Sequence, residues 1–347
     1  MIKNKSYTSI CLLILLAFVA FSLVGSCKRD RDENPPLIVT DEVTKIGSTT
    51  AFSGGTITLD DGFTITARGN CWSTALNPSV KDHKTADGTG TGEFESVLTG
   101  LLPNTSYYTR TYAIRGGSVI YGNLVSFKTE DVVTDIDGNI YNTITIGKQV
   151  WMVENLRTKR FLNGDAIGTT TTATLEIIFE PDPIYQWAYD GSEKNASKFG
   201  RLYTWYAAMD LRGLCPAGWH IPSDAEWTAM ENYLVANEYN YDGTTTGNKI
   251  ANSLASITEW RYTDEKGTAG NTDDTAFRNN SGFTALPGGY RNSEGRFVNI
   301  GISGCWWSSS EWQTYNAFYR YLYAFRNDLN RSSYFEFGGL SVRCIRD

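Results

Sequence analysis

Short stretches in which hydrophobic and polar residues alternate recur through residues 37–128. They are rich in β-branched and aromatic side chains, which favour strands, and glycine-containing turns separate them. In one such stretch Tyr107 and Thr109 fall on one face and Tyr108 and Arg110 on the other. The pattern predicts an all-β sandwich, with strands that include residues 56–59, 63–68 and 119–121.

A helical period appears farther along the chain. Trp227, Met230 and Leu234 stand at positions i, i+3 and i+7, which places them on one side of a helix. Ser223 and Glu226, three residues apart just before this period, have the spacing of a capping box. The sequence therefore predicts a helix that begins directly after Ser223.

Two further patterns belong to the same half of the chain. Residues 135–167 alternate in the manner of two strands around a turn at Gly147 and Lys148. Residues 200–210 have the pattern of a short helix. Strands and helices are thus mixed after residue 133, in contrast to the strands predicted before it.

Near the C-terminus a row of aromatic residues alternates with a second row along an expected strand. Because side chains of a strand point alternately to opposite faces, one row must face away from whatever buries the other. Tyrosine and tryptophan offer large rigid contact area with a polar group, and asparagine offers adaptable hydrogen bonds. We expect a ligand surface here, with the alternative that the same aromatics pack in the core or against the first domain. The candidate ligand-binding residues are Trp312, Tyr315, Tyr319, Tyr321, Tyr323, Phe325 and Asn327.

The first residues predict export and a lipid anchor. Lys3 and Lys5 precede an apolar run at residues 10–23, the order of a signal peptide. The sequence LVGSC that ends at Cys27 resembles the lipobox of bacterial lipoproteins, so residues 1–26 are expected to be removed and Cys27 acylated. The alternative is an unlipidated secreted protein that is cleaved near Ser26.

Residues 27–36 are charged and end in two prolines, so we expect a lipidated, extended tether. They resemble the surface-export signals of Bacteroidota lipoproteins, which implies an outer-membrane protein displayed on the cell surface. The alternatives are a periplasmic-facing location and a plain solvated linker. Without residues 1–26 the chain keeps 29 basic and 38 acidic residues. This acidic balance argues against nucleic acid as a partner, so the lipid chains are the expected contact with the membrane.

The first domain carries a recognisable motif. LLPNTSY at residues 101–107 resembles a segment of fibronectin type III domains in which the tyrosine hydroxyl bonds back to the upstream backbone. This resemblance implies a fibronectin type III-like, immunoglobulin-like domain over residues 37–130, of a kind that usually spaces or presents a partner domain.

The second domain resembles the FISUMP (Fibrobacter succinogenes major paralogous) domain over residues 133–347. The motifs occur in the family's order: residues 135–167, GRLYTWYAAMD, CPAGWHIPSDAEW, GFTALPGGYRN, GCWWSSSEW and GLSVRCIRD. The resemblance implies an α+β, C-type-lectin-like fold related to formylglycine-generating enzymes, with two helices packed on small twisted sheets.

The same resemblance implies a disulfide between Cys215 and Cys344, as expected in an oxidising compartment. Four cysteines apart from Cys27 and the signal-peptide cysteine allow three pairings, so other bridges stay open. With this pairing, Cys71 and Cys305 would remain free, buried thiols.

We expect no catalytic residues, no metal and no cofactor. Formylglycine-generating relatives bind copper through two neighbouring cysteines, whereas Cys305 is followed by no other cysteine until Cys344. Only two histidines occur, and His220 is expected to be a packed, hydrogen-bonding residue. Asp135, Asp137 and Asn139 are spaced somewhat like calcium ligands, but a turn explains them better, and the EPN and WND motifs of calcium-dependent lectins are absent.

These observations predict a cell-envelope lipoprotein that displays a lectin-like domain for binding an extracellular protein or glycan, in adhesion or recognition. One alternative is a degenerate relative of an enzyme fold, or an accessory protein of a glycan-utilisation system. Another is a structural component of the envelope. Residues 274–276 also match a short Bacteroidota O-glycosylation sequon, with Thr275 as the acceptor.

Overall fold

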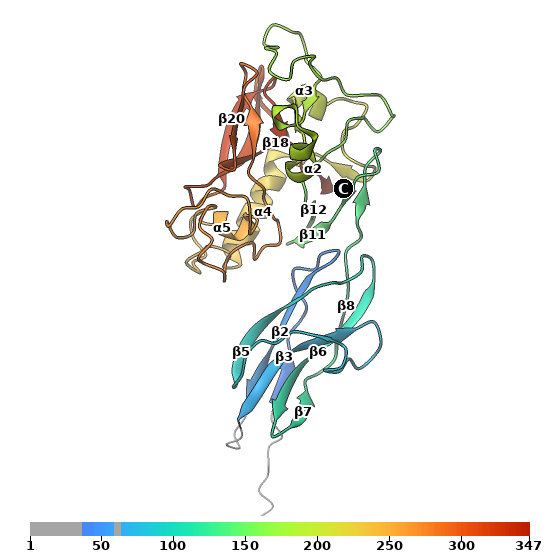
Figure 1. The fold of residues 1–347 in the computed structure, drawn as a ribbon, viewed down its shortest axis with the longest axis vertical. Helices are drawn as coiled ribbons and strands as arrows, with labels where there is room; N and C mark the ends of the chain where they lie inside the picture. The colour runs from blue at the N-terminus through green and yellow to red at the C-terminus, as the bar shows by residue number, and fades with distance from the viewer. Residues whose placement is uncertain (1–36, 59–63) are drawn as a thin grey trace, which may run out of the picture.

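The computed structural model describes residues 37–58 and 64–347. They form two domains placed end to end (Figure 1), an N-terminal sandwich and a larger mixed domain that ends at the C-terminus. No helix in the described part of the chain is long and apolar enough to cross a membrane. The predicted signal peptide and Cys27 lie outside the described residues.

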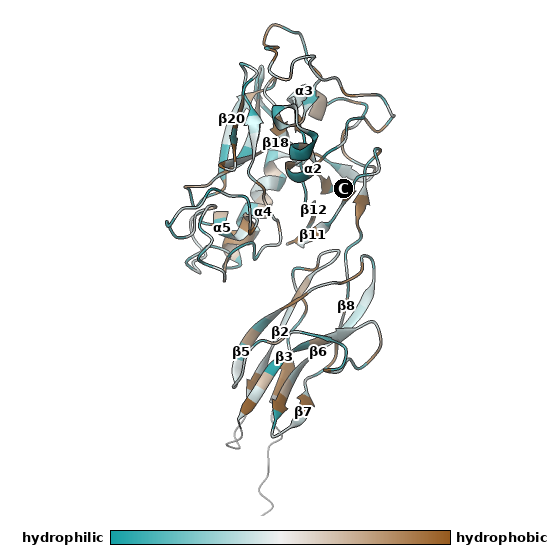
Figure 2. Ribbon diagram, viewed as in Figure 1, coloured by the Kyte–Doolittle hydropathy of each residue, from teal (hydrophilic) through white to brown (hydrophobic). Residues whose placement is uncertain are grey.

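The N-terminal domain is a β-sandwich of the fibronectin type III and immunoglobulin kind. Three strands in the order β1-β2-β5 form one sheet, and β4-β3-β6-β7 form the other, with β8 also paired to β6. Hydrophobic brown stretches recur on these strands in Figure 2, whereas helix α2 of the second domain is mostly hydrophilic teal. The strands are β1 Leu37–Thr40, β2 Ala51–Thr58, β3 Ile65–Ser73, β4 His83–Lys84, β5 Gly92–Leu98, β6 Ser106–Arg115, β7 Ser118–Tyr121 and β8 Val125–Lys128.

The hydrogen bond expected at residues 101–107 between the tyrosine hydroxyl and the upstream backbone, known as a tyrosine corner, is present. The backbone N–H of Leu102 donates to the Tyr107 hydroxyl at 3.0 Å. The Tyr107 ring is buried and stacks on Phe127, with ring centroids 5.7 Å apart. Along β6 the face that begins at Tyr107 is buried, and the opposite face is partly exposed, as the alternation predicts.

We expect Tyr107→Phe to destabilise the sandwich by about 1 kcal/mol, because it removes the acceptor of the Leu102 N–H and leaves the ring packing intact. Hydrogen–deuterium exchange of peptides from β3 and β6 measures this loss locally. Tyr108→Phe is the matched control, since Tyr108 points to the other face of β6. Equal exchange rates in wild type and Tyr107→Phe would contradict a stabilising corner.

The C-terminal domain contains a hairpin, a four-stranded sheet and an eight-stranded sheet. The four-stranded sheet has the order β11-β12-β22-β15. The eight-stranded sheet has the order β13-β14-β21-β18-β16-β17, and β19 pairs with both β18 and β20. The strands are β9 Val133–Thr134, β10 Ile140–Tyr141, β11 Thr143–Ile146, β12 Gln149–Met152, β13 Gln186–Trp187, β14 Leu202–Tyr203, β15 Trp219–His220, β16 Gly288–Arg291, β17 Phe297–Ile300, β18 Ser303–Gln313, β19 Asn316–Tyr323, β20 Asn330–Phe335, β21 Leu340–Ser341 and β22 Ile345–Arg346.

The main helix begins where the sequence predicts. Ser223 caps it: its hydroxyl accepts from the Glu226 N–H at 3.2 Å, and a Glu226 carboxylate oxygen accepts from the Ser223 N–H at 2.8 Å. The predicted stripe of Trp227, Met230 and Leu234 is fully buried. The helices are α2 Glu193–Phe199, α3 Trp205–Ala208, α4 Asp224–Ala236 and α5 Ala251–Leu254, with a 3-10 turn η1 at Tyr189–Gly191.

The prediction of a short helix over residues 200–210 is wrong in its extent. Only Trp205–Ala208 are helical, a single turn capped by the Thr204 hydroxyl, which accepts from the Ala207 N–H. Leu202 and Tyr203 instead form strand β14, which pairs with β13 and β21. Tertiary pairing of these two apolar residues thus prevails over their local helical pattern. The hairpin expected around Gly147 and Lys148 is confirmed as β11–β12.

An aromatic cluster forms the core between α4 and the two sheets. Trp151 and Trp227 have ring centroids 4.8 Å apart, and Phe283 meets Trp306 at 6.2 Å, almost perpendicular to it. The guanidinium of buried Arg343 lies 4.1 Å from the Phe283 ring centre. Such edge-to-face and cation–π contacts add to the burial of large apolar rings.

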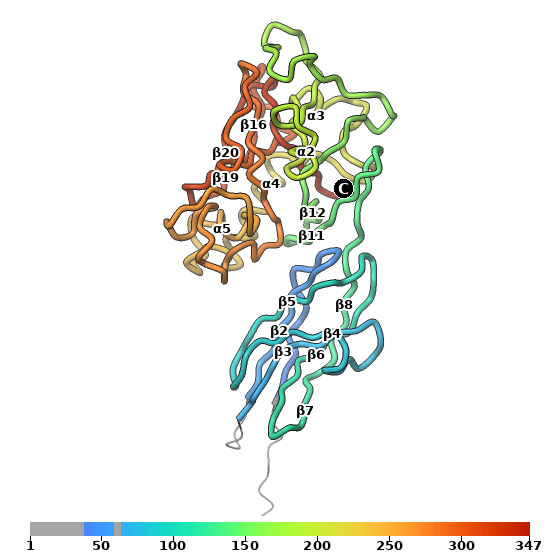
Figure 3. The backbone as a smooth tube through the Cα atoms, viewed as in Figure 1, coloured from blue at the N-terminus to red at the C-terminus, as the bar shows by residue number. Residues whose placement is uncertain are grey.

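The two domains meet through backbone as well as side-chain contacts. Gly47 forms an antiparallel bridge with Ile144, and the Thr145 N–H donates to the Ile46 carbonyl at 3.2 Å. Glu130 accepts from the Thr145 hydroxyl at 2.7 Å and forms an ion pair of 3.0 Å with Arg346. Figure 3 shows the β11–β12 hairpin against this end of the sandwich.

The described chain begins at the opposite end of the sandwich. Strand β2 starts just after the loop that contains Gly47 and runs away from the second domain. Leu37, the first described residue, pairs with Thr58 at the far end of β2. The sandwich therefore stands between the start of the described chain and the C-terminal domain.

His220 is half-exposed and hydrogen-bonded, and thus less packed than the sequence predicted. Its Nδ1 lies 2.7 Å from Asp347 Oδ1, and its Nε2 lies 2.9 Å from Glu226 Oε1. Desolvation lowers the pKa of His220, but the hydrogen bonds to Asp347 and Glu226 outweigh it and raise the pKa above 6.5.

Because the folded-state pKa of His220 is raised, its stabilising effect is full below about pH 6.5 and is lost as the pH rises through the folded pKa. His220→Gln should therefore lower the free energy of unfolding at pH 5.5 by at most about 1 kcal/mol, since the pairs are partly solvated. At pH 9 the difference from wild type should be smaller. Urea midpoints at the two pH values test this, with His83→Gln in the sandwich as control; a difference that grows with pH would contradict it.

Candidate ligand-binding site

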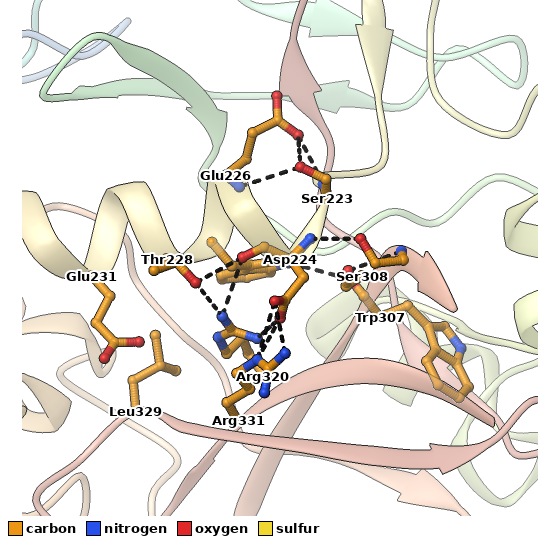
Figure 4. Close-up of polar contacts among 12 residues, drawn as sticks. Ser223, Asp224, Glu226, Thr228, Glu231, Trp307, Ser308, Arg320, Leu329 and Arg331 are labelled. Atoms are coloured by element: carbon orange, nitrogen blue, oxygen red, sulfur yellow. Dashed lines mark hydrogen bonds and ion pairs between the residues drawn. The ribbon is translucent and has the colours of Figure 1, made fainter. Parts of the chain in front are cut away.

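Strand β19 has two chemically different faces. Arg320 and Leu322 are buried against α4, where Arg320 donates to Asp224 Oδ1 at 2.6 Å and to the Thr228 hydroxyl at 2.9 Å (Figure 4). The opposite face carries Tyr319, Tyr321 and Tyr323, which are all partly buried. Only the first face is thus covered by the helix.

The uncovered face lines a pocket of about 240 Å³. The register of β18 and β19 brings the lining residues together: Tyr321 lies opposite Cys305 of β18, and Tyr323 lies opposite Ser303. Neighbouring strands complete the wall, so residues from six strands contribute. We call it the tyrosine pocket, and its lining is Tyr290, Asn299, Ser303, Cys305, Tyr319, Tyr321, Tyr323, Tyr334 and Leu340.

The aromatic rings of this pocket form a connected wall. The Tyr319 and Tyr321 rings are nearly parallel, with an interplanar angle of 22° and centroids 5.4 Å apart. Tyr334 approaches Tyr319 at 5.9 Å and Tyr290 at 5.7 Å, edge to face in both cases. The rings therefore hold one another in place, which limits the side-chain entropy that ligand binding would cost.

Several hydroxyls of the pocket have no hydrogen-bond partner in the described part of the chain. Within residues 37–58 and 64–347, no hydrogen bond engages the hydroxyls of Tyr290, Tyr319, Tyr321 and Tyr323. These four oxygens are not fully buried, so they remain in contact with solvent. They are therefore available to donate to, or accept from, a ligand.

The pocket is electrically neutral at neutral pH. Burial raises the pKa of the Cys305 thiol to about 12, so it stays protonated and a poor nucleophile. Burial also raises the pKa of Tyr290, Tyr319, Tyr321 and Tyr334 above the usual value of 10. Near Tyr321, Arg326 donates to both carboxylate oxygens of Asp328, at 2.9 and 2.8 Å, so these two charges offset each other.

The structure brings together three of the seven predicted ligand residues. Trp312 and Tyr315 lie at the β18–β19 turn, outside the pocket, with 51% and 63% of their surface exposed. Phe325 packs edge-on against Tyr323, with centroids 5.4 Å apart. Asn327 accepts the Ala251 N–H through its backbone carbonyl. The aromatic row is thus neither fully exposed nor core.

Tyr290 and Tyr334 complete the pocket, and the sequence did not predict either as a site residue. Tyr334 shares one face of β20 with Asn330 and Ser332, so an alternation signal was available. Tyr290 belongs to β16, which pairs in parallel with β18, and local sequence does not indicate that pairing.

A second hollow, of about 350 Å³, lies near the disulfide and includes Met209, Leu211 and His220. Its charged groups are already engaged: both nitrogens of His220 have partners, and Asp210 accepts from Arg212 at 2.8 Å. The tyrosine pocket therefore offers a ligand more unpaired hydrogen-bonding groups.

The structure confirms the predicted disulfide and the two predicted free thiols. Cys215 and Cys344 form a disulfide across 129 residues of sequence, and Cys71 and Cys305 are free and buried. Thr275, the predicted glycosylation site, is exposed, and its modification stays a prediction. Asp135, Asp137 and Asn139 form a turn in which the Asp135 carboxylate accepts two backbone N–H groups. No group of three His, Cys, Asp or Glu side chains suited to a metal ion occurs among the described residues.

The sequence model of the Fibrobacter succinogenes major domain matches residues 144–346, more than half of the 347-residue chain. The chain belongs to the Fibrobacter succinogenes major domain family. No curated protein matches it. Every residue of the tyrosine pocket falls inside the stretch that matches the Fibrobacter succinogenes major domain, and the sandwich lies outside it.

Solved structures resemble a smaller part of this family member. The sensor domain of the anti-sigma factor RsgI4 from Pseudobacteroides cellulosolvens is 20% identical; the match covers 28% of this chain and 96% of that one, with a TM-score of 0.22. The sixth fibronectin type III domain of human fibronectin type III domain containing protein 3 is 22% identical, over 28% of this chain and 82% of that one, with a TM-score of 0.20. The sandwich assignment rests on the strand order and register described above.

Proposed function

We propose that this chain is an outer-membrane lipoprotein, displayed on the cell surface, whose C-terminal domain binds an extracellular protein or glycan through the tyrosine pocket. The observation that carries the proposal is an uncovered sheet face with clustered tyrosines and unpaired hydroxyls. Pockets that combine aromatic walls with a few polar groups are the usual form of binding sites. Recognition or adhesion is the role that such a site serves best.

The architecture supports display. A lipid at Cys27 and the tether of residues 27–36 would hold the start of the sandwich near the membrane. The sandwich then places the C-terminal domain at its far end, since Leu37 and Gly47 lie at opposite ends of it. The disulfide fits an oxidising compartment outside the cytoplasm. We also propose that nucleic acid is not a partner of this chain.

We further propose a binding domain without catalysis or cofactor, with a C-type-lectin-like arrangement. The only thiol of the pocket, Cys305, has its pKa raised to about 12 by burial, which suits a structural role. The remaining lining consists of tyrosines, an asparagine, a serine and a leucine. These groups bind and orient a ligand but provide no general base at neutral pH.

Arrays of glycans and of extracellular proteins test the proposal. The chain from residue 28 to 347, which includes all described residues, is compared with Tyr319→Ala/Tyr321→Ala. We expect at least one ligand whose binding the double variant loses by tenfold or more, while its circular dichroism spectrum stays native. Ligands bound equally by both proteins, or none at all, would contradict a binding role for the pocket.

A further inference from the structure

We infer that the tyrosine pocket takes an uncharged, polyhydroxylated ligand: a neutral saccharide unit. This inference rests on the proposed binding function and narrows its ligand class. It combines three observations: a neutral lining, unpaired hydroxyls beside two other polar side chains, and aromatic rings in the pocket wall.

The neutral lining argues against charged ligands. The nearby Arg326 is bound on two of its nitrogens by Asp328, so an anion would have to compete with an existing carboxylate. The whole chain carries a formal net charge of −7, which repels anions further. An ammonium ligand would find no carboxylate in the lining to pair with.

The hydroxyls argue against a ligand without hydrogen-bonding groups. Tyr290, Tyr319, Tyr321 and Tyr323 have hydroxyls without a described partner, and a ligand that covered them without bonding would leave them desolvated. A quaternary ammonium group, which aromatic cages often bind, has this defect. Neighbouring hydroxyls of a sugar can each donate and accept, and so they match a cluster of phenols.

Asn299 and Ser303 extend this polar set. Asn299 has a left-handed backbone conformation, with φ at 64°, and no hydrogen bond from its side chain is found among the described residues. An amide both donates and accepts, and therefore complements a pair of sugar hydroxyls. Ser303 accepts weakly from the Cys305 thiol at 3.8 Å, which leaves its own proton free.

The ring surface and the size of the pocket fit one or two sugar rings. A pyranose has a C–H face that packs against an aromatic ring, and the Tyr319 and Tyr321 wall supplies such rings next to the hydroxyls. The cavity of about 240 Å³ is slightly below the roughly 300–1,000 Å³ typical of drug-sized ligands. A longer glycan would therefore place only part of its length in the pocket.

Calorimetric titration of residues 28–347 with matched probes tests the ligand class. The probes are a panel of neutral hexose and pentose oligosaccharides, galacturonic acid oligomers that differ from galactose oligomers by a carboxylate, and choline. At least one neutral oligosaccharide should bind tenfold or more tightly than the galacturonic acid oligomers and choline. Tyr321→Phe, which keeps the ring, should weaken that binding by roughly two- to tenfold through one lost hydrogen bond. Tyr315→Phe, outside the pocket, should not change it.

The possible outcomes separate this inference from the proposed function. Pocket-dependent binding of galacturonic acid oligomers or choline in preference to neutral sugars overturns the saccharide inference and leaves the proposed function in place. Pocket-dependent binding of array proteins, without binding of any saccharide, likewise overturns the saccharide inference and leaves the proposed function in place. If neither the arrays nor the titrations show binding that Tyr319→Ala/Tyr321→Ala weakens, both the inference and the proposed function are wrong.

Discussion

Removal of the disulfide by Cys215→Ala/Cys344→Ala is expected to lower the free energy of unfolding of the C-terminal domain by about 4 to 5 kcal/mol. The bridge closes a loop of 129 residues, and the chain-entropy model gives this value for a loop of that length. For a domain of this size the melting temperature should fall by roughly 10–20 °C. The effect is large because the bridge joins the segment before β15 to the segment between β21 and β22.

Tryptophan fluorescence measures this loss, since Trp72 is the only tryptophan of the sandwich and the other nine lie in the C-terminal domain. Reduction of the wild-type protein should reproduce the shift of the double variant. Cys71→Ser is the matched control: it removes a buried thiol of the sandwich without opening a loop. A wild-type protein whose unfolding midpoint is the same before and after reduction would contradict the prediction.

Asp224→Ala is expected to destabilise the C-terminal domain by about 3 to 5 kcal/mol. Arg320 is fully buried, and Asp224 is the carboxylate that pairs with it, at 2.6 Å (Figure 4). Loss of that carboxylate leaves a buried guanidinium without its ion-pair partner, one of the costlier changes in a protein interior, because Glu231 acts on Arg320 without forming an ion pair with it. The Thr228 hydroxyl and the Asp224 backbone carbonyl accept from the same guanidinium and do not replace the charge.

Arg331→Ala is the matched control for this site. Arg331 binds the same carboxylate at 2.9 Å, but about half of its side chain is exposed, so its loss should cost less than about 1 kcal/mol. Urea unfolding of both variants gives the comparison. Similar losses for Asp224→Ala and Arg331→Ala would show that burial of Arg320 does not make the pair critical.

The pH dependence of the contribution of Asp224 to stability provides a second test. Desolvation raises the pKa of Asp224, but hydrogen bonds from Arg331 and Arg320 outweigh it and lower the pKa below 3.8. The carboxylate therefore contributes fully above about pH 4, and its contribution is lost as the pH falls through the folded pKa. The difference between wild type and Asp224→Ala should accordingly shrink in acid.

Local chemistry explains which parts of the fold could be predicted. The start of α4 follows from Ser223 and Glu226 alone, and the β11–β12 hairpin from residues that adjoin each other in sequence. The disulfide followed from the family resemblance. In contrast, the extent of α3 depends on the pairing of β14 with distant strands, which residues 200–210 do not encode locally.

The tyrosine pocket could be predicted only in part. Alternation along β19 placed Tyr319, Tyr321 and Tyr323 on one face, but it did not show which face α4 covers. The covered face carries Arg320, a residue of a type that is usually exposed, which is buried here and paired with Asp224. Tyr290 and Tyr334 joined the site through strand pairings that only the assembled sheet reveals.

The most direct test of a binding role for the tyrosine pocket compares two conservative variants for one ligand found on the arrays. Tyr319→Phe/Tyr321→Phe removes two pocket hydroxyls, and Trp312→Phe/Tyr315→Phe alters the exposed aromatics outside the pocket. We predict that the pocket variant binds at least roughly fivefold more weakly than wild type, which corresponds to about 1 kcal/mol, while the outer variant binds as wild type does. Weaker binding by the outer variant, with the pocket variant unchanged, would contradict the account.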